Sequence, residues 1–328
     1  MLALEIASRS ADEWSVPISA TRVQEWRDRN GRICAIGYAE EGRGWLEWSG
    51  LATFAFADGS TEVLAIPHAP HLTSPEQLQS THEQLPDDKQ RLAIEDIFHR
   101  SATPIILQAF GREALHASAV LIDQHVVGFC GLSESGKSTL AYAINRLGYP
   151  HLADDALLLD FAEMREPGGP LVKLLPFSPR LRPASRLFFG IGQQSLVESA
   201  SDFIRTAPSP LTPGLSPTGP TATPAQRTRE RLSGRLSMLF VLDRNGAPTP
   251  RITQMPEADA FTHVLTHAYC FNPVDERSKR RIVANYLSLV SQVPVYRLEF
   301  SGELRHLDGM ATAVLETVGG RSLVRATE

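Results

Sequence analysis

Hydrophobic positions in the first 86 residues recur at the two-residue spacing of β-strands. Phe54 and Phe56 alternate with small residues, and Asp58-Gly59 offers a tight turn before the apolar stretch 63–66. All four tryptophans of the chain fall in this part, and they are interpreted as core and hairpin packing or, alternatively, as the lining of a peptide-binding groove. The pattern predicts a β-rich N-terminal domain over residues 1–86, with acceptor or partner binding as its hypothetical role.

The spacing changes to that of helices after residue 86, where we place the boundary with a second domain over residues 87–328. A first predicted helix has four apolar residues near one face: Leu92, Ile94, Ile97 and Phe98. A second helix is predicted from Pro104 to about Phe110, with Gly111 ending it.

From residue 117 onward the pattern reads strand, loop, helix and strand. Apolar stretches over 117–122 and 126–130 predict two strands joined by a tight turn. Residues 138–147 predict a helix with three inward-facing side chains: Leu140, Ala143 and Ile144. Further strands are predicted over 151–153 and 156–161. This order of elements predicts an α/β fold with a mixed sheet.

The rest of the second domain begins with a segment of different composition. Residues 207–226 are rich in proline, serine and threonine and lack an apolar period, which predicts a mobile loop. Beyond this loop, apolar periodicity predicts two strands and three helices: 238–242 and 295–300, then 258–269, 276–290 and 310–318.

Composition narrows the classes of protein that fit. The 328 residues are 42% hydrophobic and 21% charged, which is ordinary for a folded chain, and the net charge of -5 argues against a broadly basic nucleic-acid surface. The three cysteines form no C-x-x-C pair that would indicate a zinc site. The N-terminus does not read as a signal peptide, and no apolar run approaches the roughly 18 residues of a membrane helix. We therefore expect a cytoplasmic protein without a nucleic-acid or membrane partner.

The clearest chemical signal is a glycine-rich loop that fits the pattern G-x-x-x-x-G-K-[ST] and precedes a predicted helix. In this pattern the backbone N–H groups meet phosphate oxygens, Lys137 reaches the β/γ-phosphates and the Ser138 hydroxyl coordinates Mg²⁺. Glu134 is unusual here because it adds a carboxylate to a loop that binds phosphate, and its side chain is expected to point to solvent or to a basic partner such as Arg182 or Arg227. The predicted nucleotide-contacting residues are Gly131, Leu132, Ser133, Glu134, Ser135, Gly136, Lys137, Ser138 and Thr139.

Three further residues are candidates for the same site. Asp154 and Asp155 follow a predicted strand, so one carboxylate would hold Mg²⁺, directly or through water, and the other would accept a proton from an attacking hydroxyl. The alternative is a solvated acidic turn. His116 precedes the first strand of the hairpin and could contact a phosphate, the metal or the acceptor; alternatively it is a satisfied, partly buried histidine.

The order His116, glycine loop, Asp154-Asp155 resembles the catalytic domain of HPr kinase/phosphorylase, which is related to the nucleotide-binding domain of PEP carboxykinases. The match is tightest over residues 115–161, and the layout is more similar to divergent HPr-kinase-related proteins, some of them encoded with lasso-peptide clusters. The resemblance implies a P-loop kinase domain of this type that uses ATP and Mg²⁺ to phosphorylate a serine of a peptide or protein. It implies Asp155 as general base, and Ser138 and Asp154 as metal ligands. From their place in the motif and beside it, we also expect Lys137 and His116 to be catalytic.

The chain also departs from that family, and other functions stay open. After Phe161 it lacks the family's second glycine-rich signature, so we expect a different acceptor-facing half. Arg180, Arg182 and a cluster from Arg227 to Arg235 either steady phosphate or an acidic peptide, or form a solvated basic surface. The alternatives to a serine kinase are a nucleotide-dependent switch without a phosphoryl acceptor and a small-molecule hydroxyl kinase. A homo-oligomer is left open.

Overall fold

The computed structural model describes residues 2–7, 14–28, 30–68, 88–164, 168–173, 181–191 and 234–325. The chain divides into two compact units: Met1–Arg112 with Tyr269–Ile282, and Glu113–Ala268 with Val283–Glu328. The predicted loop over 207–226 and the predicted boundary near residue 86 both lie outside the described residues.

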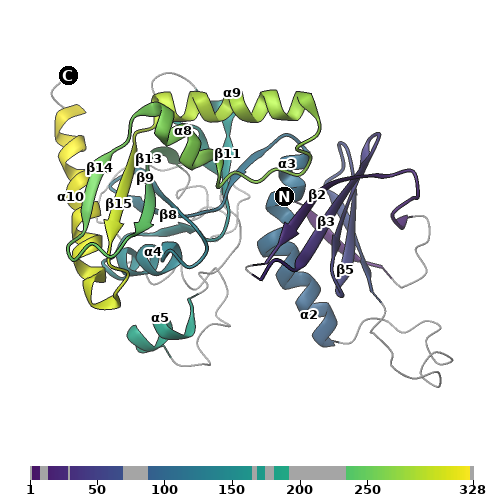
Figure 1. Ribbon diagram of the computed structural model, residues 1–328, viewed down its shortest axis with the longest axis horizontal. Helices are drawn as coiled ribbons and strands as arrows, with labels where there is room; N and C mark the ends of the chain where they lie inside the picture. The colour runs from purple at the N-terminus through teal and green to yellow at the C-terminus, as the bar shows by residue number, and fades with distance from the viewer. Residues whose placement is uncertain are drawn as a thin grey trace, which may run out of the picture. The chain divides into compact units, whose positions relative to one another are not determined.

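The first unit is built on a six-stranded sheet with the order β1-β6-β5-β4-β3-β2 (Figure 1). Consecutive strands from β2 to β6 pair antiparallel, and β1 pairs parallel with β6. The predicted turn at Asp58-Gly59 joins β5 to β6, and Gly59 adopts a positive φ of 79° there. Trp45 is buried in β4, as core packing requires. The strands are β1 (Ala3–Ile6), β2 (Thr21–Arg27), β3 (Ile33–Glu40), β4 (Arg43–Trp48), β5 (Ala52–Ala57) and β6 (Glu62–Pro67).

Two helices and a π-helical turn complete the hydrophobic core of this unit: α2 (Asp88–Ile97), η2 (Phe98–Ala102) and α3 (Thr103–Ala109). Ile94 and Phe98 are buried, and the Phe98 ring lies 6.0 Å from the Phe54 ring. The prediction for Leu92 was wrong: its side chain is 65% exposed, because two residues along a helix turn about 200° and carry Leu92 away from Ile94. The first unit therefore runs on to Arg112, past residue 86, because these helices pack on the N-terminal sheet.

The second unit contains a nine-stranded sheet, and its parallel and antiparallel pairs confirm the predicted mixed sheet. Along the sheet the order is β10-β8-β9-β13-β12-β11-β7, and β15 pairs with β13 and β14. The central strands β9, β13 and β15 are parallel, whereas β8 and β9 form an antiparallel hairpin. The strands are β7 (Glu113–Leu115), β8 (Ala117–Ile122), β9 (His125–Cys130), β10 (His151–Ala153), β11 (Leu157–Asp160), β12 (Leu171–Lys173), β13 (Gly234–Arg244), β14 (Arg251–Gln254) and β15 (Val295–Phe300).

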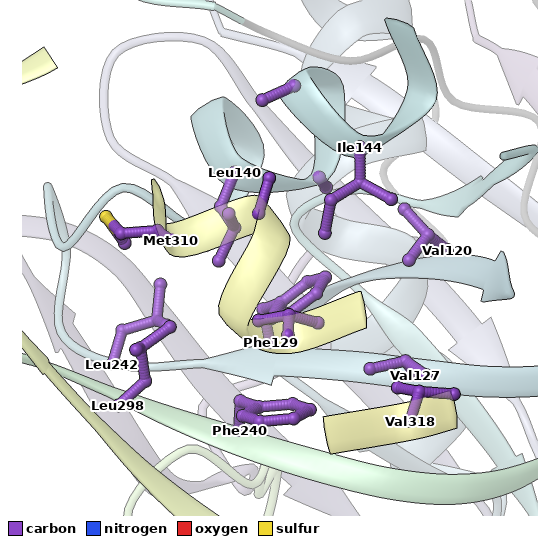
Figure 2. Packing of buried hydrophobic residues seen from close by; sticks show 14 of the residues in the cluster. Val120, Val127, Phe129, Leu140, Ile144, Phe240, Leu242, Leu298, Met310 and Val318 are labelled. Carbon is purple, nitrogen blue, oxygen red and sulfur yellow. The ribbon is translucent and has the colours of Figure 1, made fainter. Parts of the chain in front are cut away.

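Helices α4 (Lys137–Arg146) and α10 (Leu307–Arg325) pack on strands β8, β9, β13 and β15 of this sheet. Figure 2 shows Leu140 and Ile144 of α4 directed into the cluster that contains Phe129 and Phe240, whose rings lie 5.9 Å apart. The prediction that Leu140, Ala143 and Ile144 face inward is confirmed by their burial. Because α4 starts directly after the glycine loop, this packing anchors the loop to a rigid core.

The remaining helices include α5 (Pro183–Phe188), which the sequence did not predict. Helix α8 (Glu257–Leu265) ends before the predicted 269, whereas α9 (Glu276–Gln292) and α10 extend beyond their predicted ends. Short 3₁₀ turns lie at η3 (Phe161–Glu163) and η5 (Leu304–His306). No helix in the described part of the chain has the length and apolar character needed to cross a bilayer.

Candidate functional site

The glycine loop leaves the buried end of β9 and enters α4. Gly131 has a φ of 154° and Gly136 a φ of 98°, and both values lie where side chains are rarely accommodated. A Cβ on Gly131 would come within 2.7 Å of Ser135 Oγ and 3.1 Å of the Leu242 carbonyl oxygen. The curve of the loop therefore depends on glycine at this position. The strand, loop and helix stand in the order that the sequence motif requires.

Lys137 is held inside the curve of the loop. Its Nζ donates hydrogen bonds to the carbonyl oxygens of Gly131, at 2.9 Å, and Leu132, at 3.2 Å. The side chain is buried, and burial lowers the pKa of Lys137, an effect that the charges of Asp155 and Asp154 partly oppose. The ammonium is therefore poorly solvated and bound to neutral groups, so an anionic ligand beside it would be strongly stabilised.

The loop opens into a cavity of about 730 Å³, a volume typical of small-molecule sites. Its wall includes residues 133–139 of the loop and α4, together with His116 and Asp155. Apolar side chains also line it, among them Phe300, Leu307 and Met310. The wall thus combines cationic and hydroxyl groups with apolar surface, as a ligand that has both a charged and an apolar part requires.

His116 and Asp155 meet on this wall. His116 Nε2 lies 4.0 Å from Asp155 Oδ1, and the backbone N–H of His116 donates to the His267 carbonyl at 2.7 Å. Burial first, then the charges of Lys137 and His267, lower the pKa of His116 to about 4. The imidazole is therefore neutral at pH 7, and its contact with Asp155 is not a full ion pair. Asp155 has a φ of 60°, a left-handed conformation that is uncommon outside glycine.

Asp154 points in another direction from its neighbour. Its side chain is fully buried, and its carboxylate accepts a hydrogen bond from Ser118 Oγ at 2.7 Å. The two residues lie in a bend that follows β10, and of the two only Asp155 lines the cavity. The structure thus distinguishes an inward carboxylate, Asp154, from a cavity-facing one, Asp155.

Most of the predicted site residues lie together. His116, Ser133, Glu134, Ser135, Gly136, Lys137, Ser138, Thr139 and Asp155 line the cavity. Among the described residues predicted for the site, Gly131, Leu132 and Asp154 do not line it. In the same part of the chain, no group of three or more histidine, cysteine, aspartate or glutamate side chains could hold a metal ion by itself.

Glu134 has the basic partner that the sequence suggested. Arg182 Nη1 lies 2.6 Å from Glu134 Oε1, so this prediction is confirmed for Arg182. Arg235 instead donates to the Gly169 carbonyl oxygen at 3.2 Å. The other arginine candidates, Arg180, Arg227, Arg229 and Arg231, lie outside the described residues.

Sequence reasoning missed several residues on the cavity wall. Ser185 of α5 shares a hydrogen bond with Thr139 Oγ1 at 2.9 Å, and Arg244 is the last residue of β13 and packs beside Gly302. A Cβ on Gly302 would overlap the Arg244 guanidinium, so this glycine leaves the space that Arg244 occupies. No local signal marks these residues, because only the fold brings them beside the loop.

Comparisons with protein-family models and with curated proteins give no match. Among solved structures the chain is similar to the HPr(Ser) kinase/phosphatase from Coxiella burnetii, at 12% sequence identity. The similarity covers 65% of this chain and 93% of that chain, with a TM-score of 0.29. A relationship this distant carries no conclusion about activity, so the functional argument rests on the residues of the cavity.

Proposed function

We propose that this protein is an ATP-dependent kinase that transfers the γ-phosphate to a serine hydroxyl of a peptide or protein. The observation that carries the proposal is that Lys137 and Ser138 share one cavity with Asp155 and His116. A loop that binds phosphate is sufficient for nucleotide binding. A carboxylate and a neutral imidazole at the same cavity supply what transfer to a hydroxyl additionally needs.

The glycine loop and the two residues beside it have separate roles in the proposal. The backbone N–H groups of residues 131–138 and the Lys137 ammonium hold the phosphates, and the buried position of Lys137 strengthens its attraction to them. Asp155 orients the acceptor hydroxyl and takes its proton as the oxygen attacks. His116 is neutral and beside Asp155, so it leaves the carboxylate charged and available as a base.

The donor set fits Mg²⁺, which prefers oxygen ligands and is commonly bound by one or two carboxylates together with substrate phosphates. Ser138 and Asp154 are the residues proposed to hold it. Ser138 lines the cavity, whereas Asp154 is buried and would act through a bridging water. When bound, Mg²⁺ neutralises charge on the transferred phosphate.

The acceptor, rather than the loop, distinguishes the candidate functions. A switch transfers phosphate to water, a small-molecule kinase transfers it to a free hydroxyl compound, and the proposed kinase transfers it to serine in a peptide. The test is to follow γ-labelled phosphate from ATP with Mg²⁺ in the presence of a serine peptide mixture, including peptides encoded beside the gene, and of small hydroxyl compounds.

The proposal predicts label on peptide serine that is lost in Asp155→Asn. Asp259→Asn, which removes an exposed carboxylate from α8, serves as the matched control and keeps transfer. Label that appears in inorganic phosphate alone, while ATP binding is intact, would support the switch and reject the kinase.

A further inference from the structure

Glu134 and Arg182 form an ion pair on the cavity wall although they are far apart in sequence. The distance from Arg182 Nη1 to Glu134 Oε1 is 2.6 Å, and the side chains are 58% and 42% exposed. Both residues line the cavity that also contains Lys137 and Ser138. Exposed ion pairs contribute little to stability, so stability alone does not explain a carboxylate at this place.

The position of Glu134 is unfavourable in two respects. Its φ of 71° lies in the left-handed region, which glycine adopts freely and other residues adopt at a cost. Its carboxylate also repels an anion that approaches the loop. A residue that is unfavourable both locally and for the ligand points to a function of the carboxylate itself.

Arg182 reaches the cavity from a segment that is docked on α4. The residue directly precedes α5, and Ser185 of that helix shares a 2.9 Å hydrogen bond with Thr139. Beyond α5, the Phe189 ring lies 4.7 Å from the Tyr142 ring. These contacts fix the backbone of Arg182 beside the loop. The positive charge of Arg182 also contributes to the lowered pKa of the Lys137 ammonium.

We propose that Glu134 holds Arg182 beside the loop, and that Arg182 exchanges Glu134 for the terminal phosphate of a bound nucleoside triphosphate. That phosphate carries more negative charge than a carboxylate and can accept two parallel guanidinium hydrogen bonds. A diphosphate lacks this group and leaves Arg182 on Glu134. The pair therefore discriminates a triphosphate from a diphosphate, with Glu134 as a positioning residue. This inference rests on the proposed function, because it needs a nucleoside triphosphate in the cavity.

The test is calorimetric binding of ADP and of a non-hydrolysable ATP analogue, both with Mg²⁺, to the full chain. Arg182→Gln removes hydrogen bonds to a charged group. We therefore expect the affinity for the triphosphate analogue to fall about tenfold and the affinity for ADP to fall less than about twofold. Glu134→Gln raises the affinity for the triphosphate analogue about threefold, because Arg182 no longer has to break an ion pair with a carboxylate before it binds the phosphate. In the double variant the ratio of the two affinities matches the ratio in Arg182→Gln, because Glu134 sets this ratio only through Arg182.

Arg186→Gln is the matched control. It removes the same charge from α5 at a residue outside the cavity wall, so it changes both affinities by the same factor. Equal weakening of the binding of both nucleotides by Arg182→Gln would overturn this inference and leave the proposed function intact. An unchanged ratio of the two affinities in Glu134→Gln would do the same. A wild-type chain that binds neither nucleotide would overturn the proposed function and this inference with it.

Discussion

Asp155 Oδ1 lies 4.0 Å from His116 Nε2 on the wall of the cavity that the glycine loop enters. The two residues come from different places in the sheet: His116 stands between β7 and β8, and Asp155 follows β10. Since the pKa of His116 is lowered to about 4, its ring is neutral at pH 7 and does not neutralise the carboxylate. This contact places the carboxylate proposed as the base in the same cavity as the loop proposed to bind phosphate.

Acid should destabilise the protein through its neutral histidines. Burial lowers the pKa of His267 to about 4, below the roughly 6.5 of an unfolded chain. The unfolded state therefore takes up a proton that the folded state does not, and stability is lost as the pH falls from about 6.5 toward 4. We expect His267→Gln to reduce the loss of unfolding free energy between pH 7 and pH 5 by about 2 kcal/mol, as measured by urea denaturation. An identical loss in the variant would contradict the assignment.

Lys137 should matter for ligand binding and not for folding. Its buried ammonium pays a desolvation cost that Met at the same position avoids, so Lys137→Met leaves the melting temperature of the free protein unchanged or raised. The same change removes the anion partner, so the rise in melting temperature on adding ATP and Mg²⁺ disappears. Thermal denaturation with and without nucleotide measures both effects.

The exposed Lys279→Met in α9 serves as the control for charge removal and keeps the ATP-dependent rise. A Lys137→Met protein that is stabilised by ATP as strongly as the wild type would show that the loop does not bind phosphate through this side chain.

Gly131 should be less tolerant of a side chain than other glycines with positive φ. Gly131→Ala meets Ser135 Oγ and the Leu242 carbonyl, whereas Gly246→Ala, also at positive φ, has open space around its Cβ. The backbone conformation costs both variants about 1 kcal/mol of unfolding free energy, and the steric overlap at Gly131 lowers it further, by about 1–2 kcal/mol. Chemical denaturation of the two variants checks the difference. Equal losses would mean that the loop relaxes without cost.

The parts that sequence predicts best are those fixed by neighbouring residues. The helix over 138–147 carries its own apolar period and is followed by Gly148, whose φ of 101° ends it, so α4 was predicted within one residue at each end. The same holds for the turn at Asp58-Gly59. The assignment of Leu92 to the buried face was wrong because the helical period places Leu92 about 200° from the buried Ile94.

The parts that sequence does not predict depend on contacts between distant segments. Ser185 and Arg244 enter the cavity wall only because α5 docks on α4 and β13 lies between β9 and β15. The sequence alone does not show that Asp154 is buried and accepts a hydrogen bond from Ser118 of β8, whereas Asp155 lines the cavity. The roles proposed for both carboxylates remain predictions.

The central claim is that the loop binds nucleotide while Asp155 performs the chemistry. The most direct measurement is the turnover of Asp155→Asn beside its affinity for ATP, on the acceptor found by phosphate transfer. The account predicts that kcat falls about 100-fold to 10,000-fold, the range for removing a general base, while the Kd for ATP changes less than about threefold. Turnover that survives the substitution, or an affinity that falls in step with turnover, would contradict it.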